Sequence, residues 1–316
     1  MHLLIPYASC SSEPCRQTLA NLALPRLQRL LQRLSLTATD AGDDYTLSPP
    51  HERALARACG LPVEDGKIPW AAWQAASTPA NPGHQAWALI TPCHWQVGAD
   101  HVTLGDPNAL QLQEQESLAL LDAMRPFFEE DGMALSYAAA TRWLARGELF
   151  RNLATASLDR VLGRPIDAWM PEAPQARPLR RLQNEMQMLL YTHPVNDARA
   201  QRGLPPVNSF WVSGTGALPS PPPSPSGRGG NSPVVPDTLR EAALRGNWPA
   251  WAQSWQQLDA TEIERLLAAL DEQGAATLTL CGERSACTYE ARPQSLWRRI
   301  SNPLGRKPLS FFLEQL

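Results

Sequence analysis

Short apolar runs alternate with amphipathic helical stretches along this chain, and that alternation constrains the fold more than any other feature. The first run, "LLIPYA" from Leu3, predicts a buried first strand. A later run, "AATLTLCGERSA" from Ala275, predicts a strand that leads into a turn at Gly282. Between them, "AWALITPCHWQVGADHVTL" (86–104) predicts two strands around a Gly-Ala-Asp turn. Strands that alternate with helices indicate an α/β fold.

Four helical stretches accompany these strands. "SPPHERALARACG" places Ser48 in the N-cap position, and "TEIERLLAALDEQG" has Thr261 and Glu264 at the spacing of a capping box. The helix that contains "LRRLQNEMQMLLY" should end before His193, because Pro194 disfavours an α conformation at the residue before it. The predicted helices cover residues 18–34 (which Pro25 can kink or start), 48–60, 179–191 and 261–274.

The length of 316 residues suits one large α/β domain or two medium ones with a sizeable core. We predict an α/β domain formed by residues 1–64 and 176–316, with an inserted α+β part at 65–175. The stretch "LPSPPPSPSGRGGNSPVVPD" (218–237) is rich in Pro, Ser and Gly, which predicts an extended, mobile insert within the α/β domain.

Charge and hydropathy exclude several kinds of partner. The formal charge is −3 and the arginines are scattered, so the chain lacks the basic stripe of a nucleic-acid or anionic-membrane surface. No apolar run approaches the ~20 residues that span a bilayer, and "MHLLIPYAS" lacks the regions of a signal peptide. Six cysteines in so long a chain do not form a disulfide framework. We expect a soluble, cytoplasmic protein with no nucleic-acid or membrane partner.

Ligands of open α/β sheets bind at the carboxyl ends of strands, which draws attention to "PYASCSS" (Pro6–Ser12) and "CGERSA" (Cys281–Ala286). Both segments are polar, but neither carries a convincing nucleophile–base pair. The cysteines lack the spacing of zinc ligands, so we expect them to be buried as small hydrophobic residues. Three tryptophans with helical core spacing are expected in the core rather than on a stacking surface: Trp248, Trp251 and Trp255.

The hairpin at 86–104 contains weak candidates for metal ligands. His94 and His101 could approach each other across the ladder, beside Asp100, and hold a metal or a water molecule. In the other interpretation, backbone groups satisfy the two imidazoles. The sequence leaves both interpretations open.

The segment "THPVNDARAQRGLPPVNSFWVSGTG" (Thr192–Gly216) has no helical period and is dense in turn-forming and hydrogen-bonding residues. We therefore expect a loop rather than a simple helix or strand. Asn196 and Asn208 can satisfy the backbone of such a loop locally. The loop could equally hold a ligand.

Several segments resemble the archaeal-type cofactor-independent phosphoglycerate mutases. "ALPRLQRLL" (23–31) resembles their segment after the first strand, and "LCGERSA" (280–286) is similar to the strand-end "T-G-D-H-S/G" of the alkaline-phosphatase superfamily. The whole chain, above all "TPCHWQVGADHV", "TASLDRV" and "LRRLQNEMQMLLYTHPVNDAR", resembles the RpfE-type regulatory proteins of proteobacteria. Residues at positions that match the mutase motif "H-x-x-N-x-x-R-x-x-G-x-x-x-x-N-x-x-x-x-x-G-x-G" are His193, Asn196, Arg199, Gly203, Asn208, Gly214 and Gly216.

This resemblance implies an alkaline-phosphatase-like sheet with helices on both faces and a pocket for a phosphorylated substrate. The ligand-binding residues that it implies are His193, Asn196, Arg199, Asn208, Glu283 and Arg284.

The departures from the mutase pattern bear on catalysis. Those enzymes use two divalent metals held by Asp and His and a Ser nucleophile at a helix N-terminus. Here the first strand ends in Pro6-Tyr7-Ala8, and Glu283-Arg284 replace the Asp-His pair; a guanidinium has no lone pair for a metal. Ser48 falls where the nucleophile would, although an N-cap role explains it equally well. Arg284, with Arg199 and Arg160, could instead bind a phosphate, or each could pair with a nearby acidic residue.

Three functions follow. The preferred one is a mutase-like regulatory or binding protein without the two-metal site and without a cofactor, which binds a small phosphorylated metabolite or a protein partner. The second is an active, Mn- or Zn-dependent phosphoglycerate mutase or phosphatase. The third is a protein-interaction scaffold. Metal ligands for the enzyme would come from Glu13, Asp43, Asp44, His51, His94 and His101.

Overall fold

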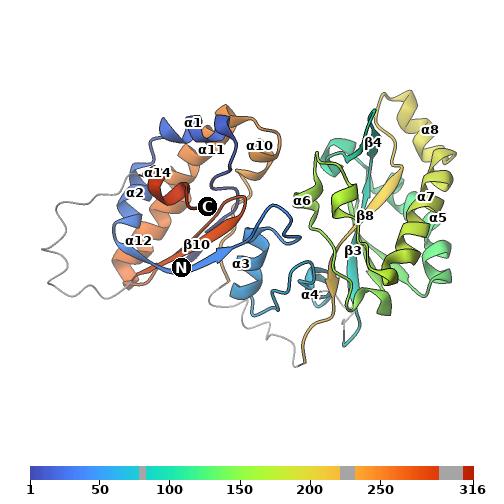
Figure 1. Cartoon of the computed structure of the whole chain (residues 1–316), viewed down its shortest axis with the longest axis horizontal. Coiled ribbons are helices and arrows are strands. Elements are labelled where there is room, and N and C mark those ends of the chain that lie inside the picture. The colour runs from blue at the N-terminus through green and yellow to red at the C-terminus, as the bar shows by residue number, and fades with distance from the viewer. Residues whose placement is uncertain (78–82, 221–231, 292–308) are drawn as a thin grey trace, which may run out of the picture. The chain divides into compact units, whose positions relative to one another are not determined.

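The computed structural model describes residues 1–77, 83–220, 232–291 and 309–316. The chain divides into two compact units, each with its own sheet and core. The first unit comprises Met1–Tyr45, Pro49–Gly60 and Ser224–Leu316, and the second comprises Thr46–Ser48 and Leu61–Pro223. Helices pack on a sheet in both units, which confirms the predicted α/β class (Figure 1).

The first unit has a four-stranded sheet in the order β1-β9-β10-β2. Strands β1 and β9 are parallel, whereas β10 runs antiparallel to both of its neighbours. Its elements in chain order are β1 (His2–Ile5), α1 (Glu13–Ala20), α2 (Pro25–Leu31), β2 (Leu34–Ala41), α3 (Pro50–Ala58), α10 (Arg240–Leu244), α11 (Trp248–Leu258), the π-helical η5 (Asp259–Ile263), α12 (Glu264–Gln273), β9 (Thr277–Cys281), β10 (Ser285–Ala291) and α14 (Leu309–Leu313).

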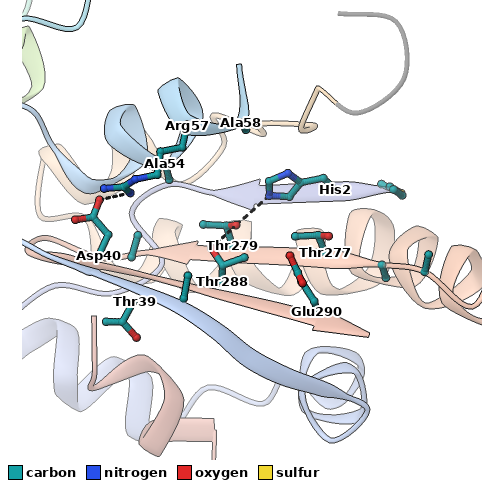
Figure 2. Close-up of a pocket in the computed structure, with 15 residues that line it drawn as sticks. His2, Thr39, Asp40, Ala54, Arg57, Ala58, Thr277, Thr279, Thr288 and Glu290 are labelled. Atoms are coloured by element: carbon teal, nitrogen blue, oxygen red, sulfur yellow. Dashed lines mark hydrogen bonds and ion pairs between the residues drawn. The ribbon is translucent and has the colours of Figure 1, made fainter. Parts of the chain in front are cut away.

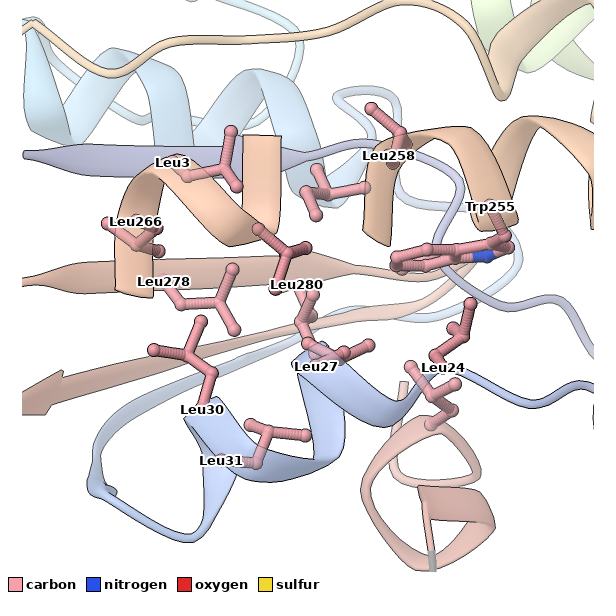
Figure 3. Close-up of a cluster of buried hydrophobic side chains, with 14 of the residues drawn as sticks. Leu3, Leu24, Leu27, Leu30, Leu31, Trp255, Leu258, Leu266, Leu278 and Leu280 are labelled. Carbon is pink, nitrogen blue, oxygen red and sulfur yellow. The ribbon is translucent and has the colours of Figure 1, made fainter. Parts of the chain in front are cut away.

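Helices cover both faces of this sheet, as predicted. Successive strand side chains point to opposite faces, so Leu278 and Leu280 of β9 face the main core while Thr279 faces the other way. In Figure 3 the leucines of α2 meet those of β9 and the side chains of α11 and α12. On the opposite face, Ala54 and Leu55 of α3 pack against Leu4 of β1, Cys281 of β9 and Ala286 of β10.

Tryptophans of α11 lie in the core of the first unit, as their spacing predicts. Trp251 and Trp255 are fully buried, and their rings meet edge to face with centroids 6.2 Å apart. The half-buried Trp248 packs on Trp251 in the same manner. The helical spacing of these tryptophans therefore places them in the hydrophobic core.

Two local predictions for this unit need correction, and a third falls partly outside the described residues. The predicted helix at 18–34 is two helices, and Pro25 begins the second. Thr261 is not a cap, because the helix continues from Trp248 to Gln273 through η5, and the Thr261 hydroxyl donates to the Gln257 carbonyl instead. Residues 221–231 of the predicted Pro-rich insert lie outside the described residues. Farther along the insert, Val234 exchanges backbone hydrogen bonds with the edge of β1.

The second unit has an antiparallel sheet in the order β6-β7-β3-β8 and a separate hairpin of β4 and β5. None of the helices within the described ranges of the chain is long and apolar enough to cross a membrane. The elements of this unit are α4 (Trp70–Ala75), β3 (Trp87–Cys93), β4 (Trp95–Val97), β5 (Val102–Leu104), η1 (Pro107–Leu110), α5 (Glu114–Glu130), β6 (Ala134–Ala139), β7 (Arg142–Arg146), η2 (Glu148–Phe150), α6 (Leu158–Val161), η3 (Asp167–Trp169), η4 (Pro174–Ala176), α7 (Arg177–Tyr191), α8 (Pro194–Gln201) and β8 (Ser209–Gly216).

The second unit extends beyond the insert predicted at 65–175. Residues after 175 belong to it because β8 pairs with β3, and because the buried face of α7 packs with α5 in one core with that sheet. Helix α7 ends at Tyr191, as Pro194 predicts. The segment Thr192–Gly216, expected to be a loop, instead contains helix α8 and strand β8.

Candidate functional site

A cavity of about 690 Å³, lined by polar residues and by alanines, lies on the sheet face of the first unit that α3 covers in part (Figure 2). Alternate residues of β1, β9 and β10 point into it, because the side chains of a strand alternate between the two faces of a sheet. The alternation of Thr with apolar residues in "TLTLC" and "ACTYE" was the sequence signal for this polar face. The residues that line the cavity are Met1, His2, Ala38, Thr39, Asp40, Ala54, Arg57, Ala58, Ala275, Ala276, Thr277, Thr279, Ala286, Thr288 and Glu290.

A chain of hydrogen bonds crosses the floor of this cavity. His2 Nε2 lies 2.9 Å from Thr279 Oγ1, which lies 3.1 Å from Thr288 Oγ1. Burial lowers the pKa of His2, so its imidazole is neutral at pH 7. The floor therefore offers hydroxyl groups and a neutral imidazole, which can each donate or accept a hydrogen bond.

An ion-pair cluster borders the cavity and lines it through Asp40 and Arg57. Arg53 approaches Asp40 through Nε and Nη2 at 3.0 and 3.2 Å, and Arg57 Nη1 lies 2.5 Å from the same carboxylate. Burial raises the pKa of Asp40, but the hydrogen bonds from Arg57 and Arg53 outweigh burial and the net pKa is lowered. Two guanidinium groups share one carboxylate, so the cluster carries a net positive charge at neutral pH.

The structure brings together the two strand-end segments that the sequence singled out. Strands β1 and β9 are parallel, so their carboxyl ends meet at one edge of the sheet. Glu283 Oε2 accepts hydrogen bonds from the backbone N–H and the hydroxyl of Ser11 at 3.1 and 2.6 Å. Arg284 forms a two-point ion pair with Asp44 at 2.7 and 2.9 Å.

The same edge carries two unusual backbone features. Tyr7 adopts a left-handed conformation with φ of 56°, which non-glycine residues seldom adopt. Its ring packs against that of His51 at a tilt of 39°, with centroids 5.2 Å apart, and its carbonyl accepts a hydrogen bond from Trp251 Nε1. The carbonyl of Leu316 accepts hydrogen bonds from the backbone N–H groups of Arg284 and Ser285. These two donors in the β9–β10 turn are therefore already hydrogen-bonded.

The candidate residues from Thr192–Gly216 lie in the second unit, and they form hydrogen bonds with the backbone of that unit. His193 caps α8 by accepting a hydrogen bond from Val195 N–H, and burial lowers the pKa of this imidazole. Asn196 donates to the carbonyls of Leu190 and Val207 and accepts from Val207 N–H.

The other two candidates of that segment are equally engaged. Asn208 makes a two-point contact with the backbone of Trp95. Arg199 is fully buried and donates to the carbonyls of Pro205 and Leu110 and to Glu116. These contacts give the polar residues of the segment a structural role: their side chains fix the turn between α8 and β8.

Ser48 does not cap a helix. The N-cap residue of α3 is Pro49, and no side chain caps that helix. The Ser48 hydroxyl instead accepts a hydrogen bond from Gly66 N–H at 2.9 Å, and only 3% of the residue is exposed. The Ser48 hydroxyl is thus buried and bonded to the backbone of the second unit.

The hairpin keeps its two histidines apart. His94 lies opposite Gly105 at one end of the β4–β5 ladder, and His101 lies opposite Gly98 at the other. His94 Nδ1 contacts the Pro206 carbonyl at 2.8 Å. Asp100 and His101 are exposed at the turn. The approach of His94 and His101 across the ladder is therefore wrong, and the backbone interpretation holds for His94.

The part of the chain that the structure describes does not contain a two-metal centre. Among the residues that the structure describes, no three His, Cys, Asp or Glu side chains come close enough to hold a metal ion. The segments outside the described residues contain none of these four residue types. Of the ligands considered for an enzyme, Glu13 pairs with Arg16, and Asp44 pairs with Arg284.

Comparison with known proteins finds weak similarity to phosphoglycerate mutases. No protein-family model matches the chain. A stretch of 62 residues is 37% identical to the 2,3-bisphosphoglycerate-independent phosphoglycerate mutase of Methanothrix thermoacetophila; it covers 20% of this chain and only 16% of that enzyme.

Two solved structures are similar along most of the chain but at low TM-scores. The cofactor-independent phosphoglycerate mutase from Thermoplasma acidophilum has a TM-score of 0.38 at 15% identity, with 92% of this chain and 89% of the mutase covered. The PH0037 protein from Pyrococcus horikoshii has a TM-score of 0.45 at 14% identity, with 92% and 87% covered. These two scores are too low to support a conclusion. Over its matched stretch, the chain is similar to a cofactor-independent phosphoglycerate mutase.

Proposed function

We propose that this chain is a mutase-like binding or regulatory protein in which two-metal phosphotransfer no longer operates. The observation that carries the proposal is the arrangement at the carboxyl ends of β1 and β9. The residues in the mutase-like ligand positions are Glu283, which binds Ser11, and Arg284, which pairs with Asp44. A regulatory role of the RpfE type, with a protein partner, would be compatible with such a site.

The ligand that we propose is a small phosphorylated metabolite, bound in the cavity of the first unit. The cavity supports this choice through its volume, through the net positive charge of the Arg53–Arg57–Asp40 cluster, and through the hydroxyl donors of Thr279 and Thr288. The carboxylate of Glu290, at the opposite side of the floor, would disfavour a second negative group there and so selects for a ligand with one phosphoryl group.

The proposal for the active site is tested by calorimetric titration of the full chain with Mn²⁺ and Zn²⁺, together with mutase and phosphatase assays on 3-phosphoglycerate. We expect neither metal-dependent turnover nor a stoichiometric metal site. Metal-dependent turnover would overturn the loss of catalysis and favour the enzyme.

The proposal for the ligand is tested by thermal shift with 3-phosphoglycerate, with glycerate as the control that lacks the phosphoryl group. A ligand that binds only the native state at a hundredfold excess over Kd stabilises it by about 2.7 kcal/mol. We expect stabilisation by the phosphorylated compound alone, lost in Arg57→Gln and kept in Arg16→Gln, whose side chain pairs with Glu13 outside the cavity. Equal responses to both compounds, or no response, would reject this ligand class.

A further inference from the structure

Two cysteines near the carboxyl end of β1 lie beside the same hydroxyl group. Cys10 lies in the segment between β1 and α1, and Cys15 lies in the first turn of α1. Both residues approach one hydroxyl group: Cys10 Sγ lies 3.2 Å from Ser12 Oγ, which also accepts a hydrogen bond from the Cys15 backbone N–H at 3.4 Å. Cys10 is half-buried, whereas Cys15 is fully buried. The pair thus has one thiol that solvent can reach and one that it cannot.

The surroundings favour a thiolate at Cys10. Ser12 is the N-cap of α1, and its hydroxyl lies 3.2 Å from Cys10 Sγ. The N-terminus of a helix attracts negative charge, and a hydrogen bond to a thiolate stabilises it. The hydrogen bond from Cys15 lowers the pKa of Cys10 further, against the opposing effects of burial and of the nearby Glu283 carboxylate. That hydrogen bond and burial raise the pKa of Cys15, which therefore holds the proton.

From this geometry we propose that Cys10 and Cys15 are a redox-active dithiol that a hydroperoxide converts to a disulfide, with Cys10 as the attacking thiol and Cys15 as the resolving thiol. This site goes beyond metabolite binding and does not depend on it. Accessible, low-pKa cysteines beside a second thiol are the usual targets of such oxidation.

The chemistry balances in two steps. The Cys10 thiolate attacks one peroxide oxygen, an S–O bond forms as the O–O bond breaks, and the leaving oxygen takes a proton and departs as water or an alcohol. The Cys15 sulfur then attacks the Cys10 sulfenic acid, the S–S bond forms as the S–O bond breaks, and the hydroxyl group leaves with the Cys15 proton as water. Two electrons pass from the thiols to the peroxide.

The sequence allows a direct test, because both cysteines fall in the tryptic peptide Met1–Arg16, which has no internal Lys or Arg. The native chain is treated with hydrogen peroxide at pH 7, and remaining thiols are alkylated before digestion. We expect the Met1–Arg16 peptide to lose about 2 Da, the mass of two hydrogens, and to resist alkylation unless it is reduced first. We expect Cys15→Ala to stop at a dimedone-reactive Cys10, and Cys10→Ala to leave Cys15 a free thiol.

Matched controls separate this site from general thiol oxidation. Cys59 is also half-buried and lies outside the pair, so Cys59→Ala should leave the reaction unchanged. In the native chain Cys10 should react at least about tenfold faster than Cys59, and in urea the two rates should become similar, because the helix N-terminus and Ser12 no longer act. A Met1–Arg16 peptide that keeps two free thiols, or equal native rates at Cys10 and Cys59, would overturn the proposal.

Discussion

Arg284 and Asp44 form a two-point ion pair although 240 positions separate them in the sequence, with Nε–Oδ1 and Nη2–Oδ2 distances of 2.7 and 2.9 Å. The pair ties the β9–β10 turn to the segment that follows β2. The guanidinium that the sequence suggested for a phosphate thus has a carboxylate of the same unit as its partner.

The Arg284–Asp44 pair should contribute little to stability. Both side chains are about half exposed (51% and 56%), and exposed ion pairs are worth about 0–1 kcal/mol. We expect Arg284→Gln and Asp44→Asn each to lower the free energy of unfolding in urea by less than about 1 kcal/mol. A loss of several kcal/mol from either variant would contradict this expectation.

Arg199 should matter far more than its neighbour Arg202, although both pair with Glu116. Arg199 is fully buried and also bonds two backbone carbonyls, whereas the side chain of Arg202 is 43% exposed. Removing Arg199 leaves the carbonyls of Pro205 and Leu110 without their donor, at about 1–3 kcal/mol for each, while Arg202 still pairs with Glu116. We expect Arg199→Met to destabilise the second unit by about 2–6 kcal/mol and Arg202→Met by less than about 1 kcal/mol, measured by urea denaturation. Similar losses in the two variants would show that the buried contacts do not stabilise this unit.

Asn196 should control the turn between α8 and β8. Its amide makes three hydrogen bonds, two of them to the backbone of Val207, and it is 6% exposed. Each buried group left without its partner costs about 1–3 kcal/mol. We expect Asn196→Ala to accelerate hydrogen exchange at the Val207 amide, measured by mass spectrometry on peptides of residues 203–210. The matched variant Asn21→Ala, at an exposed helix end, should leave exchange in those peptides unchanged.

The sequence predicted the α/β class, the buried first strand, the end of α7 and the core position of Trp251, because each depends on a local period or on one proline. It mispredicted Thr192–Gly216 because α8 is only eight residues long and is fixed by contacts rather than by its own hydrophobic pattern. Asn196 and Arg199 bind backbone groups that are 11 and 89 positions away in the sequence. Hydrogen-bond partners so distant along the chain leave no pattern in the local sequence.

The candidate site was predictable only in part. The rule that ligands bind at strand ends located Ser11 and Glu283 correctly at one edge, but it could not show that Arg284 pairs with Asp44. The cavity was missed because its lining comes from β1, β2, α3, β9 and β10, which meet only through long-range strand pairing. The N-cap role of Ser48 was mispredicted for a similar reason, since its partner Gly66 is 18 positions away.

Stability of the second unit should fall in acid through Glu116. Burial raises the pKa of this carboxyl, but the backbone N–H of Gln113 and the guanidinium groups of Arg202 and Arg199 outweigh burial, so its net pKa is lowered. A lowered pKa means stabilisation that is fully present above the unfolded value, about 4.3, and is lost as pH falls through the folded value. We expect Tm to drop below about pH 4, with a smaller drop in Glu116→Gln. Identical pH profiles for the two proteins would exclude Glu116 as the source.

Alkylation of Cys10 should reach half of its maximal rate at an unusually low pH. The hydrogen bond from Cys15 and the Ser12 hydroxyl lower the pKa of Cys10 to about 6, below the ordinary thiol value of about 8.5. Because the thiolate is the nucleophile, the rate of iodoacetamide labelling at Cys10 should rise through that lower pH and level off by neutrality. In Cys15→Ala the main hydrogen bond is gone, so the midpoint should move up toward that of an ordinary thiol, while the fold, followed by circular dichroism, stays intact. Labelling at Cys10 with the same midpoint in both proteins would mean that Cys15 does not act on its neighbour.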